Sequence, residues 1–234
     1  MSAPPDRAAA AHARGMAAQR AAFEHALASG MPRAGWKVGL NVREMQERLG
    51  LAGSAVAWLD GRRVLRSGET FAVAPGSLVH AEAEIALRLR APVTAGASPA
   101  AARAAIAERM PALELVDYAR PRGDLEAILA HSIFHAATVL GAPTDAVEPA
   151  LGATLPRVEV DGAERAVANP AWAPPDLGEL LVHVAARLAP IGLGLRAGDL
   201  VICGSYVQPL AVAAGQTVAA DFGALGRVAI ALTA

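Results

Sequence analysis

The sequence predicts an α+β fold, in which helices and strands occupy different stretches of the chain. A run of strong helix formers comes first, from Asp6 to Ser29, and Gly30 with Pro32 ends it. Strand-like runs separated by glycine-containing turns follow Asp199 to the end of the sequence. The middle mixes both kinds of element without regular alternation, which favours an α+β fold over repeated βαβ units.

Length and composition predict one globular domain. The chain has 234 residues, 54% of them hydrophobic, which is enough for one substantial core. We find no internal repeat, low-complexity linker or block of charge that would mark a domain boundary. We therefore expect a single domain over residues 1–234, with residues 1–50 as an N-terminal helical part and residues 51–234 as a β-rich catalytic core.

The charged residues and the cysteine content restrict the partners and the compartment. Lys and Arg total 21 and Asp and Glu total 22, so no basic surface for nucleic acid or an anionic membrane is expected. Cys203 is the only cysteine, which excludes an internal disulfide and favours a reducing compartment. Arg7, Arg14 and Arg20 interrupt the alanine-rich beginning, and no later stretch is apolar for long enough to span a membrane. We expect a cytoplasmic protein.

Turn and capping residues divide the rest of the chain into elements. Asp60-Gly61 predicts a hairpin, and Pro75-Gly76 predicts another turn. Further expected helices cover Val42 to Leu49, Ser98 to about Arg109, Leu125 to Leu140, and Asp176 to Leu188. Expected strands cover residues 78 to 90, Ala112 to Ala119, Leu155 to Val160, Asp199 to Val207, Thr217 to Phe222, and Arg227 to Thr233.

The expected strand at residues 78–90 contains the first candidate site residues. Its apolar residues alternate with polar ones, and the polar face includes His80, Glu82 and Glu84. Because residues i and i+2 of a strand share a face, the two glutamates project side by side. Taken alone, such a pair is more simply explained by the solvated face of a half-exposed strand.

Glu114 changes the interpretation of this pair. Leu113 and Leu115 flank it, and its own strand face has mostly apolar neighbours, so we expect its carboxylate to be at least partly buried. A buried carboxylate needs a charged partner or a metal ion. Three clustered carboxylates without His or Cys ligands would form an all-oxygen site that suits Mg²⁺, Mn²⁺ or Ca²⁺ better than Zn²⁺.

Five motifs, in order, resemble the fumarylacetoacetate hydrolase superfamily, from about residue 15 to the end. The most similar branch is that of the 2-keto-4-pentenoate hydratases and 4-oxalocrotonate decarboxylases. The last motif is the closing pattern of Pro209, Gly215, Asp221, Gly223 and Gly226. The other four are Gly35-Trp36-Lys37-Val38-Gly39-Leu40, Glu82-Ala83-Glu84-Ile85-Ala86, Ala112-Leu113-Glu114-Leu115-Val116-Asp117, and Gly198-Asp199-Leu200-Val201-Ile202-Cys203-Gly204-Ser205.

The resemblance implies a fold, a cofactor and an assembly. The implied fold is a mixed β-sandwich roll of the fumarylacetoacetase C-terminal type with an N-terminal helical extension. The implied cofactor is Mg²⁺ or Mn²⁺ bound by Glu82, Glu84 and Glu114, and the implied assembly is a homo-oligomer of dimers or larger. Lys37, the only lysine of the chain, corresponds to a lysine near the metal that pairs with the substrate carboxylate or passes a proton.

Four further residues complete the expected site. We expect Asp117 to line the site as a catalytic residue and Leu40 to contact the substrate. Ser205 follows a strand and either hydrogen-bonds the substrate or belongs to a turn. His131 and His135 are four apart on an expected helix and share a face, so they are either a structural pair or place His131 in the site as a general acid or base.

The sequence also departs from the hydratase pattern. Hydratases of this branch have a Pro-Asp-x-Gly stretch where this chain has Ser54-Ala55-Val56-Ala57, and an Asp-Asn pair where it has His131-Ser132. We predict a metal-dependent hydro-lyase that acts on a small unsaturated 2-keto acid through a metal-stabilised enolate. The alternatives are a 2-keto acid decarboxylase, a C–C bond hydrolase of the acylpyruvate type, and a non-catalytic relative that binds a metabolite.

Overall fold

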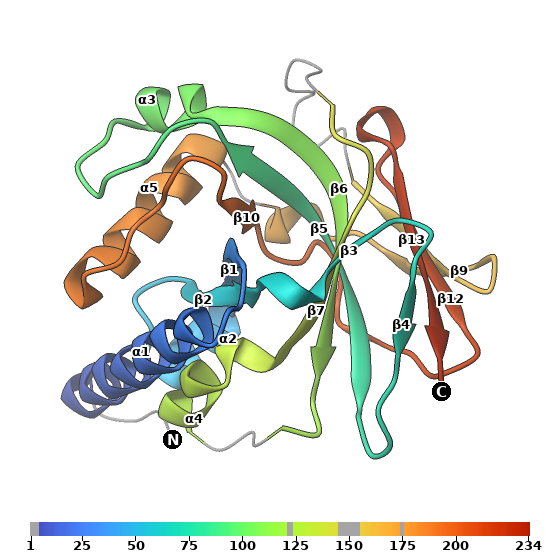
Figure 1. The fold of residues 1–234 in the computed structure, drawn as a ribbon, viewed down its shortest axis with the longest axis horizontal. Coiled ribbons are helices and arrows are strands. Elements are labelled where there is room, and N and C mark those ends of the chain that lie inside the picture. Colours follow the sequence, from blue (N-terminus) through green and yellow to red (C-terminus); the bar gives the residue numbers. More distant parts are fainter. Residues whose placement is uncertain (1–4, 121–123, 145–154, 174–175) are drawn as a thin grey trace.

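Two sheets of unequal size form the protein, and the helices gather beside the larger one (Figure 1). The computed structural model describes residues 5–120, 124–144, 155–173 and 176–234. The smaller sheet packs against β6 and β7 of the larger sheet, so the main core lies between the two sheets. This arrangement is the predicted α+β mixed β-sandwich roll.

The larger sheet has the strand order β2-β1-β10-β5-β6-β7-β3, and β11 also pairs with β5. The smaller sheet has the order β4-β13-β12-β8-β9. The strands of the larger sheet are β1 (Arg33–Gly39), β2 (Ala55–Asp60), β3 (Val64–Arg66), β5 (Val79–Leu89), β6 (Ile106–Asp117), β7 (His135–Leu140), β10 (Leu200–Ile202) and β11 (Leu210–Ala211). Those of the smaller sheet are β4 (Thr70–Ala72), β8 (Arg157–Val160), β9 (Ala163–Val167), β12 (Thr217–Asp221) and β13 (Arg227–Thr233).

Several of the helices begin and end at the residues that the sequence predicts. Asp176 accepts a hydrogen bond from Glu179 N at 2.8 Å and so caps α5, and Ser98 caps α3 in the same way. Gly50 ends α2 in the left-handed conformation. The α-helices are α1 (Pro5–Ala28), α2 (Arg43–Leu49), α3 (Pro99–Ala104), α4 (Leu125–Ala130) and α5 (Leu177–Leu188), and the 3-10 turns are η1 (Gly61–Arg63), η2 (Ser132–Phe134), η4 (Pro170–Trp172), η5 (Ala189–Ile191) and η6 (Gly223–Leu225). None of these helices is long and apolar enough to cross a membrane.

Two expected helices are wrong in extent. The helix after Ser98 ends at Ala104, not near Arg109, because β6 begins at Ile106 and pairs with β5 along most of its length. The expected helix from Leu125 to Leu140 ends at Ala130, and its second half forms β7 between β6 and β3. In both segments the pairing with neighbouring strands overrides a composition that is compatible with a helix.

Two glycines lie where backbone segments approach closely. The segment around Lys37, which is not among the expected strands, forms strand β1, and a Cβ atom on Gly35 would lie 2.0 Å from Leu200 O of β10. Asp60-Gly61 does not form a hairpin, since β2 pairs with β1 and β3 pairs with β7. Gly61 instead allows close packing, because a Cβ atom there would lie 1.9 Å from Pro32 O.

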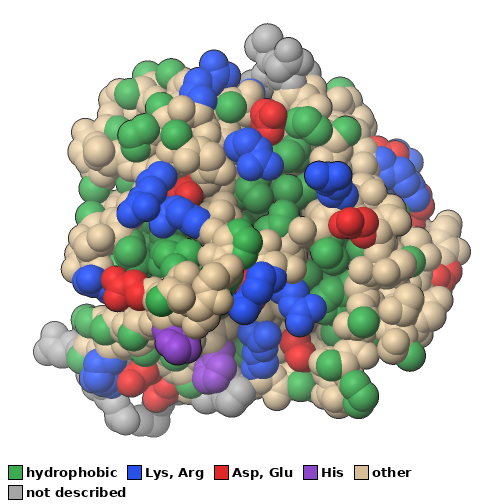
Figure 2. Space-filling view, viewed as in Figure 1, with side chains coloured by type: hydrophobic (Ala, Val, Ile, Leu, Met, Phe, Trp, Pro, Cys, Tyr) green, Lys and Arg blue, Asp and Glu red, His purple; other side chains and the backbone are tan. Residues whose placement is uncertain are grey.

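The long N-terminal helix is held to the larger sheet by aromatic packing. Phe23 of α1 lies with its ring centroid 5.2 Å from that of Trp36 in β1, and the Arg33 guanidinium stands over both rings. α1 also lies beside α4 (Figure 1). On the face shown in Figure 2, basic and acidic side chains stand next to one another between apolar patches. One exposed ion pair joins Arg88 Nε and Glu108 Oε2 at 2.9 Å. Such exposed ion pairs add little to the stability that the core provides.

The close approach of β1 to β10 gives a stability prediction. Gly35→Ala should destabilise the protein by about 2–4 kcal/mol, because the new methyl group meets a backbone carbonyl and Gly35 has a φ of 139°. Gly96→Ala is the control, since nothing lies near its Cβ position. Thermal unfolding should show a loss of about 4–16 °C in Gly35→Ala only. Equal melting temperatures would show that β1 does not lie this close to β10.

Candidate metal centre and its cavity

Pairing of β5 with β6 brings the three predicted carboxylates together. Glu82 lies directly opposite Glu114 in the ladder, and Glu84 lies two residues further along the same face. One carboxylate oxygen from each of the three lies within 4.8 Å of the other two. Glu84 and Glu114 are fully buried, whereas Glu82 is half-buried and faces a cavity. The burial expected for Glu114 is thus present.

The two buried glutamates each have one satisfied oxygen and one free oxygen. Oε1 of Glu114 accepts hydrogen bonds from Lys37 Nζ at 2.5 Å and from His135 Nδ1 at 2.8 Å. Oε2 of Glu84 accepts one from Gly204 N at 2.7 Å. The remaining oxygens, Glu114 Oε2 and Glu84 Oε1, are buried and have no hydrogen-bond partner among the residues that the structure describes.

This donor set fits a hard divalent cation. Buried carboxylate oxygens without partners are costly, and a cation bound between them would satisfy both. All three side chains offer only oxygen, the ligand that Mg²⁺ and Mn²⁺ prefer. Lys37 adds one positive charge beside Glu114, but it leaves the other two carboxylates without a cationic partner at hydrogen-bond distance among the described residues.

The three carboxyl groups differ in acidity in the absence of a cation. Burial and the neighbouring charge of Glu114 raise the pKa of Glu82 to about 7, and the same causes raise the pKa of Glu84 well above its ordinary value. Burial also acts to raise the pKa of Glu114, but the charge of Lys37 and the hydrogen bond from His135 outweigh it, so the pKa is lowered. Burial lowers the pKa of His135, so its ring is neutral at pH 7.

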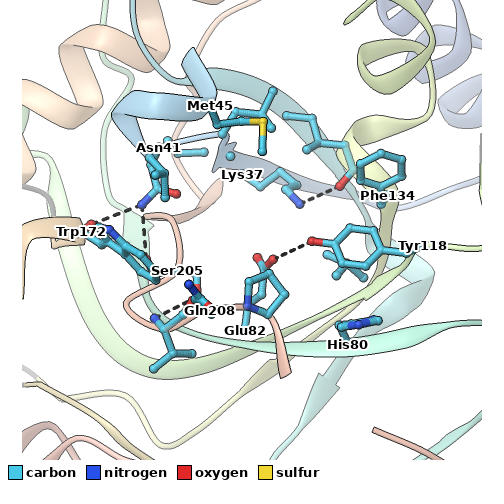
Figure 3. Close-up of a pocket in the computed structure, with 18 of the residues that line it drawn as sticks. Lys37, Asn41, Met45, His80, Glu82, Tyr118, Phe134, Trp172, Ser205 and Gln208 are labelled. Atoms are coloured by element: carbon cyan, nitrogen blue, oxygen red, sulfur yellow. Dashed lines mark hydrogen bonds between the residues drawn. The ribbon is translucent and has the colours of Figure 1, made fainter. Parts of the chain in front are cut away.

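A cavity of about 590 Å³ opens in front of Glu82 (Figure 3). Most of its wall is apolar, and Met45 of α2 lies across the cavity from Glu82 (Figure 3). Asn41 Nδ2 donates to Trp172 O at 3.2 Å and to Ser205 O at 3.3 Å, which ties the turn after β1 to two other segments. The lining residues with polar or charged side chains are Lys37, Asn41, Glu44, Arg48, His80, Glu82, Tyr118, Trp172, Ser205 and Gln208.

The structure brings some of the predicted site residues to this cavity and leaves others away from it. Lys37, Leu40 and Ser205 line the cavity. The Ser205 hydroxyl already donates to Val207 O at 2.7 Å, as in a turn. Asp117 is not among the lining residues, and its carboxylate accepts backbone N–H groups at the end of β6. His131 is exposed at the end of α4, where its ring bonds Ala127 O.

His131 and His135 do not share a helix face, so that expectation is wrong. α4 ends before them, and Ser132, Ile133 and Phe134 all adopt the left-handed conformation, with φ values of 52°, 50° and 63°. Residues other than glycine rarely adopt this conformation, so no sequence signal marks the turn. The turn directs His131 outwards and His135 inwards, and it places Ile133 O 3.2 Å from Lys37 Nζ.

Sequence reasoning missed several residues near the metal centre. His135 contacts Glu114, and Tyr118 lies with its hydroxyl 3.5 Å from Glu82 Oε1. Alternate residues of a strand share a face, so the sequence puts Tyr118 on the same face as Glu114. This signal could have identified Tyr118 as a site residue. Asn41 and Trp172 come from a turn and a 3-10 segment, and no periodic pattern identifies such positions as parts of a site.

The raised pKa values give a prediction for Glu84→Gln. In the metal-free fold, Glu82 and Glu84 keep their protons at pH values at which the same side chains in the unfolded chain, with their ordinary pKa, have lost them. The free energy of unfolding therefore falls as pH rises from about 4.5 through 7. The glutamine side chain of the Glu84→Gln variant cannot ionise. The melting temperature of this variant should therefore be about 2–6 °C above that of the unaltered protein at pH 8 without metal, and the difference should be smaller at pH 6.

Added Mn²⁺ provides the opposite test of the same substitution. It should raise the melting temperature of the unaltered protein, more at pH 8 than at pH 6, because the ligands must lose protons to bind the ion. The rise should be largely lost in Glu84→Gln. A variant that is less stable without metal at both pH values, yet equally stabilised by Mn²⁺, would contradict the assignment of Glu84 as a ligand.

The fold resembles several solved structures. A 4-oxalocrotonate decarboxylase from Pseudomonas putida G7, complexed with magnesium and adipate, has a TM-score of 0.84 and 21% identity, over 92% of this chain and 83% of that one. A fumarylpyruvate hydrolase from Pseudomonas aeruginosa, in complex with Mn²⁺ and pyruvate, has a TM-score of 0.65 and 18% identity, over 87% of this chain and 90% of that one. A 2-hydroxyhepta-2,4-diene-1,7-dioate isomerase from Mycobacterium marinum has a TM-score of 0.68 and 20% identity, over 87% and 76%.

Sequence comparison identifies the family. A search of curated protein sequences finds no significant match. Residues 35–232 match the family described as fumarylacetoacetate (FAA) hydrolase C-terminal. This range begins in β1, ends in β13 and includes all three clustered glutamates. The chain belongs to the fumarylacetoacetate hydrolase family.

Proposed function

We propose that the chain is a divalent-metal-dependent enzyme that acts on a small 2-keto acid, with Mg²⁺ or Mn²⁺ bound by Glu82, Glu84 and Glu114. The observation that supports this most is the pair of free, buried carboxylate oxygens on Glu84 and Glu114, next to the half-buried Glu82 at the cavity wall. The solved relatives that contain Mg²⁺ or Mn²⁺ together with small carboxylic acids agree with it.

A cation at this site would supply the positive charge that polarises the keto oxygen of a 2-keto acid. The chain's own residues have separate tasks. Lys37 neutralises Glu114 and offers an N–H donor at the cavity wall for the substrate carboxylate or for proton transfer. The apolar wall of the cavity excludes water from the carbon chain of the substrate, and Tyr118 lies against Glu82 at its edge.

Among the reactions of the family, decarboxylation of an unsaturated 2-keto dicarboxylic acid agrees best with the cavity. Hydration, our first expectation, would use the acid that hydratases have near position 55. Here Ala55 is fully buried and packs in an apolar cluster with Ile133 and Phe134. Decarboxylation breaks the bond between the terminal carboxylate and its carbon, releases CO₂ and leaves the electron pair in the conjugated keto acid. The product then takes up one proton, which Lys37 or water would donate.

The position of Arg48 favours a substrate that has a second carboxylate. It lines the cavity from α2, and its Nη2 lies 3.2 Å from Sδ of Met45, the residue opposite Glu82. Among the described residues its guanidinium has no carboxylate within ion-pair distance. A linear dicarboxylic acid with its keto end at the glutamates would therefore direct its other end towards this cation.

Product analysis tests the reaction. With Mn²⁺ and 2-oxohex-3-enedioate, we expect release of CO₂ and a five-carbon keto acid. Lys37→Met should lower turnover at least about 100-fold, since it removes the ammonium group that holds the substrate carboxylate or donates the proton. Gain of water alone would indicate a hydratase, and two carbon fragments would indicate a hydrolase. Binding of oxalate without turnover of any 2-keto acid would indicate a non-catalytic relative.

A second experiment tests Arg48. Arg48→Gln should weaken binding of 2-oxoadipate to the Mn²⁺-loaded protein by about 10-fold or more, because one charge-assisted hydrogen bond is lost. Binding of 2-oxohexanoate, which lacks the second carboxylate, should not change. Arg43→Gln is the control, since Arg43 lies on the same helix, pairs with Glu47 and is not among the lining residues. Equal losses for both acids in calorimetric titrations would remove Arg48 from substrate selection.

A further inference from the structure

His135 is buried, and the one hydrogen bond that its ring makes within the described part of the chain is with a proposed metal ligand. Its side chain is 2% exposed, and Nδ1 lies 2.8 Å from Glu114 Oε1. Because a carboxylate without a proton only accepts hydrogen bonds, Nδ1 bears the proton and donates it. The roles proposed above for the cavity residues do not involve His135, and it is not among the residues that line the cavity.

Two irregular features of the backbone bring this ring to Glu114. The left-handed turn of Ser132–Phe134 ends α4 and leads directly into His135. The pairing of β6 with β7 then shifts register between Leu115 and Val116, so that Val116 pairs with His135 rather than with Ala136. A bulge of this kind re-aims a side chain, and here it places His135 on the sheet face of Glu114. Left-handed residues other than glycine are costly and persist where the surrounding structure requires them.

The hydrogen bond from His135 makes the two carboxylate oxygens of Glu114 unequal. Oε1 accepts hydrogen bonds from both Lys37 Nζ and His135 Nδ1, whereas Oε2 has no hydrogen-bond partner in the described ranges of the chain. With Lys37 alone, the carboxylate has only one donor to fix its rotation, and either oxygen can turn towards the ammonium. The second donor on Oε1 removes this freedom and leaves Oε2 directed away from both donors.

We propose that His135 is a positioning residue, which fixes Glu114 so that Lys37 is held by Oε1 and the metal ion is bound by Oε2. This inference rests on the proposed metal site and adds to it a specific support. Donors behind a ligand typically contribute about 10–100-fold to metal affinity, because they orient the ligand before the ion arrives. His135 does not touch the substrate and acts only through Glu114.

The experiment compares three variants by Mn²⁺ calorimetry and by Mn²⁺ electron paramagnetic resonance. His135→Phe keeps the ring and removes the N–H donor, and it should weaken Mn²⁺ binding about 10–100-fold. His135→Asn restores an N–H at the position of Nδ1 and should recover most of the affinity. Thr138→Val is the control, since Thr138 pairs with Glu114 in the ladder, is fully buried and has an unpartnered hydroxyl. It should bind Mn²⁺ as the unaltered protein does.

The outcomes separate this inference from the proposed function. If the unaltered protein binds no Mn²⁺, the metal site itself is wrong. If it binds Mn²⁺ and His135→Phe binds equally tightly with the same resonance spectrum, the site stands and the role of His135 is wrong. An affinity lost equally in the Phe and Asn variants would show that ring packing, not the hydrogen bond, supports the site. Should the Phe variant not fold, His135→Leu also lacks the donor and replaces it in the comparison.

Discussion

The register of β5 against β6 imposes the constraint on which the site depends. It places Glu82 opposite Glu114 and Glu84 beside them, in a region where two of the three side chains are fully buried. Like charges at this separation repel, and the chain supplies one lysine to offset them. Without a cation, burial and the remaining negative charge both favour the protonated forms, so the pKa values of Glu82 and Glu84 are raised. The same constraint makes the cluster a strong candidate for binding a divalent ion.

The rest of the site follows from how the sheet supports these carboxylates. β1 presents Lys37 to Glu114, and this requires Gly35 for the close pairing of β1 with β10. The strained turn before β7 contributes Ile133 O to Lys37 and His135 to Glu114. The polar groups behind the metal centre are therefore held by strands and one tight turn. The cavity in front is lined by α2, by the 3-10 turns η2 and η4 and by loops as well as by β1, β5 and β6, and most of its wall is apolar.

The sequence was sufficient to predict the carboxylate cluster but not its surroundings. Strict alternation along β5 predicted that Glu82 and Glu84 share a face, and the apolar flanks of Glu114 predicted its burial. These are local signals with a period of two, and they hold wherever the strand lies. The position of His135 depends on three left-handed residues, none of which is glycine or asparagine, so the helical composition of that segment misled the prediction. Residues such as Arg48 and Trp172 reach the cavity only through tertiary packing.

In the proposed site, three carboxylates from two paired strands bind one divalent ion. A crystal structure of the protein with Mn²⁺ and oxalate, with data collected at an anomalous wavelength for manganese, would locate this ion. We expect one manganese peak bound by Glu82, Glu84 and Glu114, with Oε2 of Glu114 as the ligand atom and oxalate on the cavity side. A manganese ion bound elsewhere, or Lys37 and His135 displaced from Oε1 by the metal, would contradict it.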